Sequence, residues 1–457
     1  MSGVEAFDVR SSALCAPGAR VAVVGTGIAG LVAARELSLW HDVRVFEASP
    51  RIGGHTHTES IVGPDGRRRG IDMGFIVYNE RTYPLLTRLF AELGVGTEES
   101  EMSFSVRSER TGIEWNGADL DRIFAQRRNL LRPSFYRMIA GILRFNRQAP
   151  SLRDAPADLT LGDLLARERY PRPFVELYLL PMMAAIWSTE PRRVREFPVR
   201  TMAAFLHNHG MLTIDDRPIW RVVSGGSENY LDALTAPFAD CIETSTPVER
   251  IRRRDGGDLR HDGVELRTGG AWRRFDAVVL ATHSDQALRL LDDPTDAERE
   301  VLGAIPYQDN EVVLHTDARV MPRTRRAWAS WNYHLDAERT GSEPGLAHLT
   351  YWMNRLQNLD APVDYFVTLN RTAVLDPESI LVRRRFAHPL FTAASLDAKR
   401  RWPEISGGRT SYCGAYWGFG FHEDGAVSGR RAARVFAPSS VQGEPTVVAA
   451  EPAEAAA

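Results

Sequence analysis

The chain has 457 residues, of which 44% are hydrophobic, and a formal net charge of -3. This length allows two or three domains' worth of structure around a large core. The near-neutral charge, without a long basic block, argues against nucleic acid as a partner. Three scattered cysteines, Cys15, Cys241 and Cys413, form neither a disulfide framework nor a CxxC metal pattern, which is typical of a reducing compartment.

Targeting and membrane signals are weak throughout the chain. The N-terminal residues lack the charged and apolar regions of a secretory signal. The longest apolar run, LYLLPMMAAIW (177–187), is too short to cross a bilayer and contains Pro181. The sequence therefore predicts a cytoplasmic protein, with peripheral contact at the inner membrane face left open.

Residues 21–47 are typical of a dinucleotide-binding element. The strand VAVV is followed by GxGxxG at Gly25, Gly27 and Gly30, a helix from about Ile28, and a second strand ending at Glu47. The first glycine allows a tight turn, the second lets a phosphate approach the backbone, and the third lets helix and strand pack closely. Glu47 lies where a carboxylate accepts hydrogen bonds from a ribose diol.

The segment after Glu47 indicates which dinucleotide is bound. EASPRIGGHT places Arg51 and the pair Gly53–Gly54 in a second glycine loop, which can wrap around a pyrophosphate. Here the sequence resembles the flavin-containing amine oxidase, protoporphyrinogen oxidase and phytoene desaturase superfamily, which continues as E-x-x-x-R-x-G-G-R. The resemblance implies non-covalent FAD. His55 replaces the final arginine of that motif, so one phosphate or flavin contact is expected to be weaker or pH-dependent.

Two later segments extend the resemblance. Residues 246–288 are expected to form a strand, a hairpin at Gly269–Gly270 and the buried strand AVVLAT, with Val248 presenting backbone to the adenine. Residues 412–436 resemble the C-terminal flavin motif, in which a helix N-terminus points at the isoalloxazine. That arrangement would stabilise negative charge on the reduced ring.

The resemblance implies a set of cofactor contacts along these motifs. They are Gly25, Gly27, Ile28, Ala29, Gly30, Glu47, Ala48, Arg51, Gly53, Gly54, His55, Thr56, Gly74, Phe75, Val248, Thr282, Gly414, Phe421, His422 and Glu423.

The predicted fold is α/β (α+β), with a discontinuous Rossmann-like FAD domain and an inserted substrate domain of helices and a mixed or antiparallel sheet. Segments 20–85, 236–292 and 405–437 are assigned to the FAD domain, and 86–235 and 293–404 to the substrate domain. Segments 1–19 and 438–457 are predicted to be disordered. Helices are expected in YPLLTRLFAEL, SFYRMIAGILRFNRQ, TLGDLLARERY and DPTDAEREVLG, and strands in NEVVLHT, AHLTYWMN and YFVTLN.

One feature weakens an amine oxidase assignment without excluding it, and a second bears on flavin attachment. In amine oxidases of this superfamily, a lysine is linked to the flavin N5 through a water molecule. The sole lysine of this chain, Lys399, is expected to be exposed on a polar helix. Cys413 lies within the last strand motif rather than at the attachment position of monoamine oxidases. Covalent flavin attachment is therefore not expected.

The middle of the chain resembles a narrower bacterial group of flavin oxidoreductases. Segments such as MMAAIWSTEP and GFGFHEDGAVSG are also similar to the flavoprotein half of plant cyclopropane fatty acid synthases. The resemblance implies a lipid acyl substrate, including methyl-branched chains, and a fatty-acid methyltransferase as a partner. We expect two or three tryptophans to line a substrate tunnel, from the set Trp187, Trp220, Trp328, Trp331, Trp352 and Trp417.

Histidines are the principal candidates for proton transfer. His55 and His57, and His207 and His209, form HxH pairs, but no third ligand stands at metal-site spacing, so no metal is predicted. His207 and His209 are interpreted as pocket-lining or structural groups, and His283 as a positioning residue. His422, Glu423 or a pocket histidine is the candidate base, and His422 is expected beside the flavin pyrimidine edge.

The leading hypothesis is an FAD-dependent desaturase or dehydrogenase of lipid acyl chains. Hydride passes to flavin N5, and a base removes the second proton. The alternatives are an amine oxidase and a non-catalytic flavin-fold binding protein, as in the GDP-dissociation inhibitors.

Overall fold

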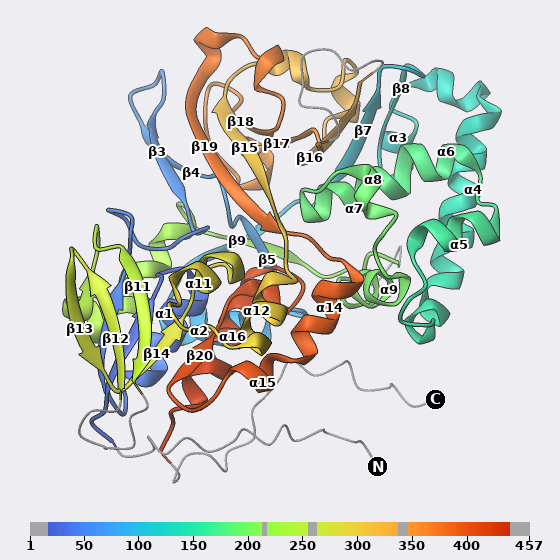
Figure 1. Cartoon of the computed structure of the whole chain (residues 1–457). Helices are drawn as coiled ribbons and strands as arrows, with labels where there is room; N and C mark the ends of the chain where they lie inside the picture. Colours follow the sequence, from blue (N-terminus) through green and yellow to red (C-terminus); the bar gives the residue numbers. More distant parts are fainter. Residues whose placement is uncertain (1–16, 213–216, 255–262, 337–345, 439–457) are drawn as a thin grey trace.

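A computed structural model describes residues 17–212, 217–254, 263–336 and 346–438 (Figure 1). The predicted disorder of segments 1–19 and 438–457 thus falls almost wholly outside the described residues. None of the helices within these four ranges is long and apolar enough to cross a membrane.

A parallel five-stranded sheet lies in the lower part of Figure 1, and its strands come from distant parts of the sequence. In sheet order they are β10 (Ile242–Glu243), β2 (Asp42–Phe46), β1 (Arg20–Val24), β14 (Ala277–Leu280) and β20 (Thr410–Tyr412). The central strand β1 pairs in parallel with β2 on one side and β14 on the other. The predicted α/β fold is therefore confirmed, and three separate motifs supply its sheet.

Both faces of this sheet are covered, which explains why β1 is apolar from Val21 to Val24 and why β14 is apolar throughout. Val21 and Val23 of β1 face a core shared with α1 (Ile28–Leu37). Ala22 and Val24 face the opposite core, shared with a three-stranded antiparallel sheet. The strands of that second sheet are β11 (Val248–Arg254), β12 (Gly263–Thr268) and β13 (Ala271–Phe275).

The helices α1 and α16 (His422–Arg434) pack unusually closely. A Cβ added at Gly429 would lie 2.1 Å from the Ala29 carbonyl oxygen, and one at Gly425 would lie 2.7 Å from the Ile28 side chain. Only glycine lets the two backbones approach this far. The contact brings the beginnings of both helices to the same end of the sheet.

A seven-stranded mixed sheet lies above the nucleotide sheet in Figure 1. Its order is β19 (Ile380–Pro389), β15 (Tyr307–His315), β18 (Phe366–Leu369), β17 (Leu349–Trp352), β16 (Trp331–Leu335), β7 (Phe104–Ser108) and β8 (Ile113–Asn116). All neighbours are antiparallel except β16 and β7. The three predicted strands of this region are confirmed as β15, β17 and β18.

A lobe of helices lies beside this sheet, at the right of Figure 1. Its members are α3 (Leu120–Ile123), the 3₁₀ turn η1 (Arg127–Leu131), α4 (Pro133–Gln148), α5 (Leu161–Glu168), α6 (Arg172–Phe174), α7 (Leu180–Trp187), α8 (Pro191–Val194) and α9 (Val199–Asn208). α5 begins at a capping box in which Thr160 and Asp163 satisfy each other's backbone amides. The predicted helices in this lobe correspond to α4 and α5.

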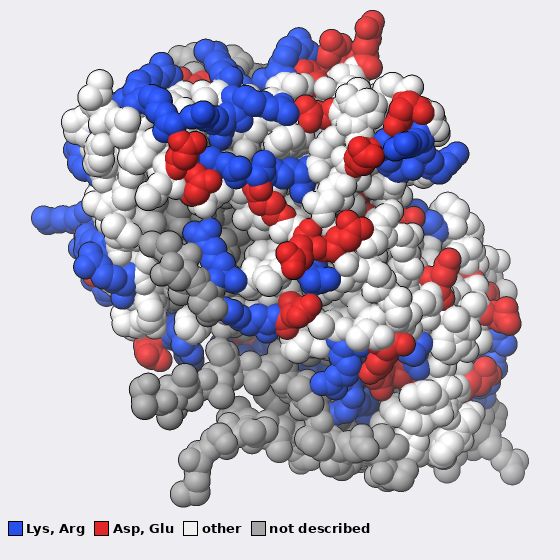
Figure 2. All heavy atoms as spheres, turned by 180° about the vertical axis from the view of Figure 1, so that it is seen from behind, with Lys and Arg blue, Asp and Glu red and all other residues white. Residues whose placement is uncertain are grey.

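The remaining elements join the two halves. They are the hairpin β3 (Thr58–Val62) and β4 (Arg68–Asp72), the small sheet β5 (Val77–Asn79), β9 (Trp220–Val223) and β6 (Thr97–Ser100), and the helices α2 (Pro84–Glu92), α10 (Leu231–Thr235), α11 (Ser284–Leu290), α12 (Asp296–Gly303), α13 (Met353–Leu356), α14 (Ala393–Arg400) and α15 (Trp402–Ile405). β5 lies in the segment assigned to the FAD domain and pairs with β9 of the segment assigned to the substrate domain. From behind, Arg and Lys side chains are interspersed with Asp and Glu among the described residues (Figure 2).

The helix contact gives a first testable expectation. Gly429→Ala should lower the free energy of unfolding by about 1–3 kcal/mol, because the new methyl group meets the Ala29 backbone. Gly407→Ala is the matched control, since a Cβ there meets nothing within 4 Å. Urea unfolding of the three proteins measures the difference. Equal stability of wild type and Gly429→Ala would contradict the close packing.

Candidate active site

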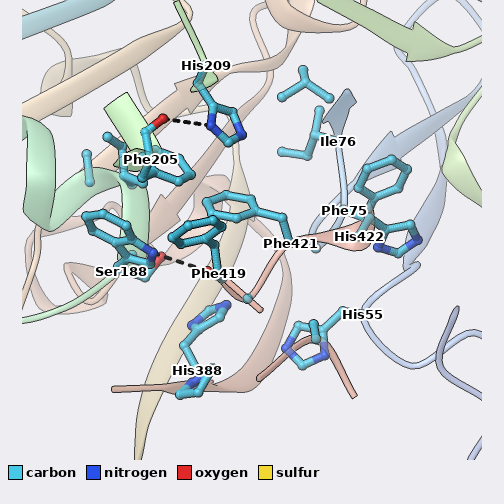
Figure 3. A pocket seen from close by; sticks show the side chains of 18 of the residues that line it. His55, Phe75, Ile76, Ser188, Phe205, His209, His388, Phe419, Phe421 and His422 are labelled. Carbon is cyan, nitrogen blue, oxygen red and sulfur yellow. Dashed lines mark hydrogen bonds between the residues drawn. The ribbon is translucent and has the colours of Figure 1, made fainter. Parts of the chain in front are cut away.

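A cavity of about 1210 Å³ connects the nucleotide sheet with the helical lobe. At one end it is lined by the glycine loop after β1, and at the other by residues of α3 and α4. Figure 3 shows its middle part, where Phe205 and Phe421 lie close to His209. The cavity therefore joins the predicted cofactor motifs to an apolar compartment.

The three glycines of the first motif have three different environments. Gly25 has φ of +106°, and a Cβ there would lie 2.8 Å from the Ala281 carbonyl oxygen. A Cβ on Gly30 would lie 2.0 Å from the Gly25 carbonyl oxygen, whereas one on Gly27 would meet nothing within 4 Å. These environments match the turn, packing and phosphate-approach roles predicted from the sequence.

The beginning of α1 is suited to an anion. Its N-cap is Gly27, which has no side chain to cap the helix. Gly27, Ile28 and Ala29 line the cavity. Its first backbone amides therefore have no side-chain cap, and the helix dipole adds positive potential. Residues at this end of the cavity fit the pyrophosphate of a dinucleotide.

Glu47 lies on the cavity wall at the end of β2. Its Oε1 accepts a hydrogen bond from the Ser49 amide at 2.8 Å, and its Oε2 accepts one from the Thr26 amide at 3.1 Å. These bonds fix the carboxylate beside the glycine loop, as a ribose-binding acid requires.

The second glycine loop folds back against the first. Gly53 forms a parallel bridge with Gly27, and its amide donates to the Thr26 carbonyl oxygen at 3.0 Å. Arg51 does not line the cavity, because its guanidinium donates to the Thr56 carbonyl oxygen at 2.7 Å and pairs with Glu228. In this structure Arg51 therefore braces the loop from behind the cavity wall.

The other predicted contacts divide in the same way. On the cavity wall lie Gly25, Gly27, Ile28, Ala29, Glu47, Ala48, Gly54, His55, Gly74, Phe75, Val248, Thr282, Gly414, Phe421 and His422. Behind the wall lie Gly30, Arg51, Gly53, Thr56 and Glu423. The residues of the second group pack against the wall or are hydrogen-bonded to the structure behind it. A sequence motif does not distinguish such supporting residues from residues that contact the cofactor.

His422 begins α16 and is held in a fixed orientation. Its ring stacks on Phe75 with centroids 3.7 Å apart, and its Nε2 lies 2.7 Å from the Tyr230 hydroxyl and 3.2 Å from Thr56 Oγ1. Burial lowers the pKa of His422 to about 3, so the ring is neutral near pH 7. A cationic His422 beside the flavin is thus not supported.

Glu423, a candidate base from the sequence, is hydrogen-bonded to backbone amides behind the cavity wall. Its carboxylate accepts hydrogen bonds from the Leu85 and Leu86 amides, at 2.8 and 2.9 Å, at the beginning of α2. Burial raises the pKa of Glu423 to about 7. The side chain links α16 to α2 and lies outside the cavity lining.

The two histidines of the HNH sequence at the end of α9, His207 and His209, point in different directions. His209 is buried and lines the cavity, whereas His207 is exposed and lies outside the cavity lining. Residues two apart on a helix point in nearly opposite directions, so the same-side arrangement that holds for an extended chain does not apply to the end of α9. His209 Nδ1 lies 3.0 Å from the Phe205 carbonyl oxygen, and burial lowers the pKa of His209 to about 4.

A group of histidines lines the cavity beside the second glycine loop. The ring centroid of His55 lies 5.5 Å from that of His388 and 6.1 Å from that of His283. Burial and the neighbouring rings hold the pKa of His55 well below its usual range, so His55 does not supply the charge of the arginine it replaces. His283 stacks on Tyr307 at 4.5 Å and begins α11, in keeping with its predicted positioning role.

Sequence reasoning did not identify His388 or its partner Asn310. His388 Nδ1 lies 2.9 Å from Asn310 Nδ2, across the pair β15 and β19. Since an amide nitrogen is a donor, Nδ1 accepts and the neutral ring carries its proton on Nε2. The arginine-rich sequence of β19 lacks the apolar alternation of a strand, so no local signal marked His388.

Lys399 is not the exposed surface residue that we expected. It is half-buried on α14, its Nζ donates to the Gly418 carbonyl oxygen, and it lies 4.0 Å from the Phe391 ring centroid. Burial lowers the pKa of Lys399 to about 7. The lysine supports the loop before α16 and is not among the residues that line the cavity.

Two further features bear on the cofactor and on metals. Cys413 is fully buried and lies outside the cavity lining, and burial raises the pKa of its thiol, which favours non-covalent flavin. Among the described residues, Glu109, His334 and Asp336 bring potential metal ligands within 4.8 Å of one another. Arg371 donates to His334 Nε2 and to Asp336 Oδ1, at 2.8 and 2.9 Å, so a guanidinium already fills that cluster.

Aromatic side chains form the middle of the cavity. Of the six tryptophans considered from the sequence, three line it, namely Trp187, Trp220 and Trp331, which confirms that expectation. Trp187 Nε1 donates to the Phe419 carbonyl oxygen at 3.2 Å, so the indole closes the wall with its polar atom satisfied.

Comparisons with known proteins agree with this geometry. The family model for flavin containing amine oxidoreductase matches residues 28–436. The carotenoid phi-ring synthase of Streptomyces griseus is 26% identical over 302 residues, which is 59% of this chain and 53% of that protein. The chain thus spans about half of that relative, and other curated relatives are matched over about a fifth of their length or less.

Solved structures share the fold over nearly the whole chain. Cyclohexylamine oxidase from Brevibacterium oxydans has a TM-score of 0.64 and 17% identity, covering 92% of this chain and 99% of its own. A fatty acid isomerase from P. acnes has a TM-score of 0.63 and 17% identity, with the same coverage. At such identities the likeness establishes the architecture alone.

Loss of the cofactor is the expected result of filling the space at Gly27. Gly27→Val should fold but purify without FAD, because the new side chain projects into open cavity where the pyrophosphate approaches. Gly407→Val, also at an unobstructed position, should purify yellow. Absorbance spectra and circular dichroism measure flavin content and folding. A folded, fully yellow Gly27→Val would refute the phosphate assignment.

The burial of His209 predicts a pH-dependent stability. Because its folded pKa of about 4 lies below the unfolded value, the unfolded chain binds more protons below pH 6.5, and stability falls as the pH decreases from 6.5 towards 4. His209→Gln should reduce this slope by up to about 1.4 kcal/mol per pH unit. Equilibrium unfolding between pH 5 and 7 measures it.

His207→Gln is the control for this measurement, since His207 is exposed in the folded protein. Its slope should equal that of the wild type. An unchanged slope in His209→Gln would show that His209 is not held neutral by the fold.

Proposed function

Because the chain belongs to the flavin-containing amine oxidoreductase family, we propose that it oxidises the acyl chain of a membrane lipid. The protein is an FAD-dependent oxidoreductase, which removes the non-catalytic alternative. The finer assignment, a desaturase or dehydrogenase of methyl-branched or unsaturated acyl chains, rests on the distal part of the cavity.

The observation that carries the proposal is the apolar lining of that distal part. Ile123 of α3 and Ile139 and Ile142 of α4 line it, together with Tyr178 and Met182. Such a wall stabilises an acyl chain by about 0.8 kcal/mol for each methylene removed from water. The apolar character of the compartment suits an acyl chain better than a small polar substrate.

The distal cavity offers little to an amine cation. Among the described residues, the carboxylate at that end is Asp119. It accepts a hydrogen bond from the Arg122 amide at 2.7 Å and so caps α3. An ammonium group entering here would lose its hydration and compete for Asp119 with the Arg122 guanidinium, which lies 3.5 Å from the carboxylate.

His209 is the side chain best placed to accept a proton. When bound, FAD accepts the hydride, that is, two electrons and one hydrogen from a substrate carbon. A double bond forms only if the adjacent carbon loses a proton. Since His209 Nδ1–H donates to the Phe205 carbonyl, the lone pair on Nε2 is left to accept that proton at the cavity wall.

Relatives give additional support of different kinds. The fatty acid isomerase with this fold is an enzyme that acts on an acyl chain. The sequence resemblance to the flavoprotein half of plant cyclopropane fatty acid synthases points to methylated chains. A fatty-acid methyltransferase partner, which would supply such chains, is part of the same proposal.

Amine oxidation is the second candidate, and one specific feature favours it. Trp187, Phe205, Phe419 and Phe421 surround the middle of the cavity, and aromatic faces attract cations. Cyclohexylamine oxidase shares the fold. The absence of a lysine from the described cavity lining and the engagement of Asp119 favour the lipid instead.

Anaerobic flavin reduction distinguishes the two candidates. Detergent-dispersed phospholipids with oleoyl or methyl-branched acyl chains should bleach the bound flavin, and mono- and polyamines should not. Ile142→Trp should slow bleaching by lipid at least roughly tenfold, because the indole fills the distal cavity. Ala140→Trp, on the exposed side of α4, should bleach at the wild-type rate. Bleaching by an amine and by no lipid would establish the second candidate.

A further inference from the structure

Large apolar side chains are exposed on one part of the helical lobe. Leu120 of α3 is 81% exposed and Leu131 of η1 is 87% exposed. Leu130, Tyr136 and Leu143 are between 45% and 47% exposed. These five residues, here called the leucine surface, come from consecutive elements within residues 120–143. Exposed apolar groups concentrated in this way are typical of an interaction site.

The cavity reaches the leucine surface. Leu120 and Leu143 are both exposed to solvent and part of the cavity lining, so they lie at its rim. Ile139 and Ile142 continue the lining inward from the same helix as Leu143. An apolar molecule at the leucine surface therefore meets a continuous apolar path into the cavity.

The stretch that carries the leucine surface has an excess of positive charge. Residues 119–148 contain seven arginines and two aspartates, with no lysine or glutamate, in a chain whose net charge is -3. Asp121 pairs with Arg127, and Asp119 lies 3.5 Å from Arg122. From neighbouring elements, Glu101 also lies 3.5 Å from Arg122, and Glu168 lies 2.8 Å from Arg144. Arg128, Arg137 and Arg147 are also exposed in this stretch. Basic residues next to exposed leucines favour a partner that is both anionic and apolar.

We propose that the leucine surface docks on the interface of an anionic lipid bilayer and that the acyl substrate enters the cavity there. This inference rests on the proposed lipid substrate. A bilayer supplies both complementary parts at once, namely acid headgroups for the arginines and hydrocarbon for Leu120, Leu130 and Leu131. Leucine side chains that enter the headgroup region place the cavity rim at the level of the acyl chains.

Vesicle flotation of the FAD-loaded full chain tests the docking. Wild type should float with vesicles of phosphatidylglycerol and phosphatidylcholine in equal amounts, and much less with phosphatidylcholine alone. Leu130→Glu combined with Leu131→Glu should lower partitioning roughly tenfold or more, because two apolar side chains no longer enter the bilayer. Replacing Arg128 by Gln should lower it about fivefold.

Leu39→Glu is the matched control, because Leu39 is 71% exposed but follows α1 in the nucleotide-binding part. It should float like the wild type. Equal flotation of the leucine-surface variant and the wild type would overturn the proposal. So would a wild type that does not float but forms a dimer that the leucine substitutions dissociate.

A second measurement separates this inference from the proposed function. With lipid dispersed in detergent, the leucine-surface variant should bleach its flavin as fast as the wild type, whereas with vesicles it should be at least tenfold slower. Flotation without bleaching by any lipid would retain the docking surface and reject the acyl substrate. Bleaching from vesicles that is unaffected by the substitutions would reject the docking surface alone.

Discussion

The close contact between α1 and α16 is the constraint on which the site depends. Gly425 and Gly429 let α16 approach the first turn of α1, where any larger residue would meet Ile28 or the Ala29 backbone. Both helices consequently begin at the cavity, although about 390 residues separate them in the sequence. Two helix N-termini in one cavity would provide positive potential to the pyrophosphate and, as the sequence resemblance implies, to the flavin ring of a bound dinucleotide.

Much of the nucleotide-binding half could be predicted from the sequence, because its function depends on backbone geometry. Gly25, Gly27 and Gly30 are each required for a steric reason, and the spacing of the motif already indicates that reason. The motif could not distinguish residues that line the cavity from residues that support the lining from behind. Arg51 and Glu423 belong to the segments that carry the resemblance, yet their hydrogen bonds hold the loop and α2 from behind the cavity wall.

The substrate half was less predictable, because its site is assembled by long-range contacts. His388 reaches the cavity from an edge strand without apolar alternation, and Asn310 orients it from the neighbouring strand. The positions of His207, His209 and Lys399 depended on the local conformation of their elements, which the residue types alone do not determine. Burial then keeps His209, His388 and His422 neutral, because the protonated, charged form of each ring would have no hydration in the interior.

The central claim is that an acyl chain occupies the path from the leucine surface to the aromatic centre of the cavity. The most direct measurement is a crystal structure of the FAD-loaded protein with a bound oleoyl phospholipid. The account predicts continuous acyl density from Leu143, past Ile142, to Phe421, with the headgroup outside. An acyl chain bound elsewhere, or a distal cavity that holds ordered water while lipid is bound outside it, would contradict the account.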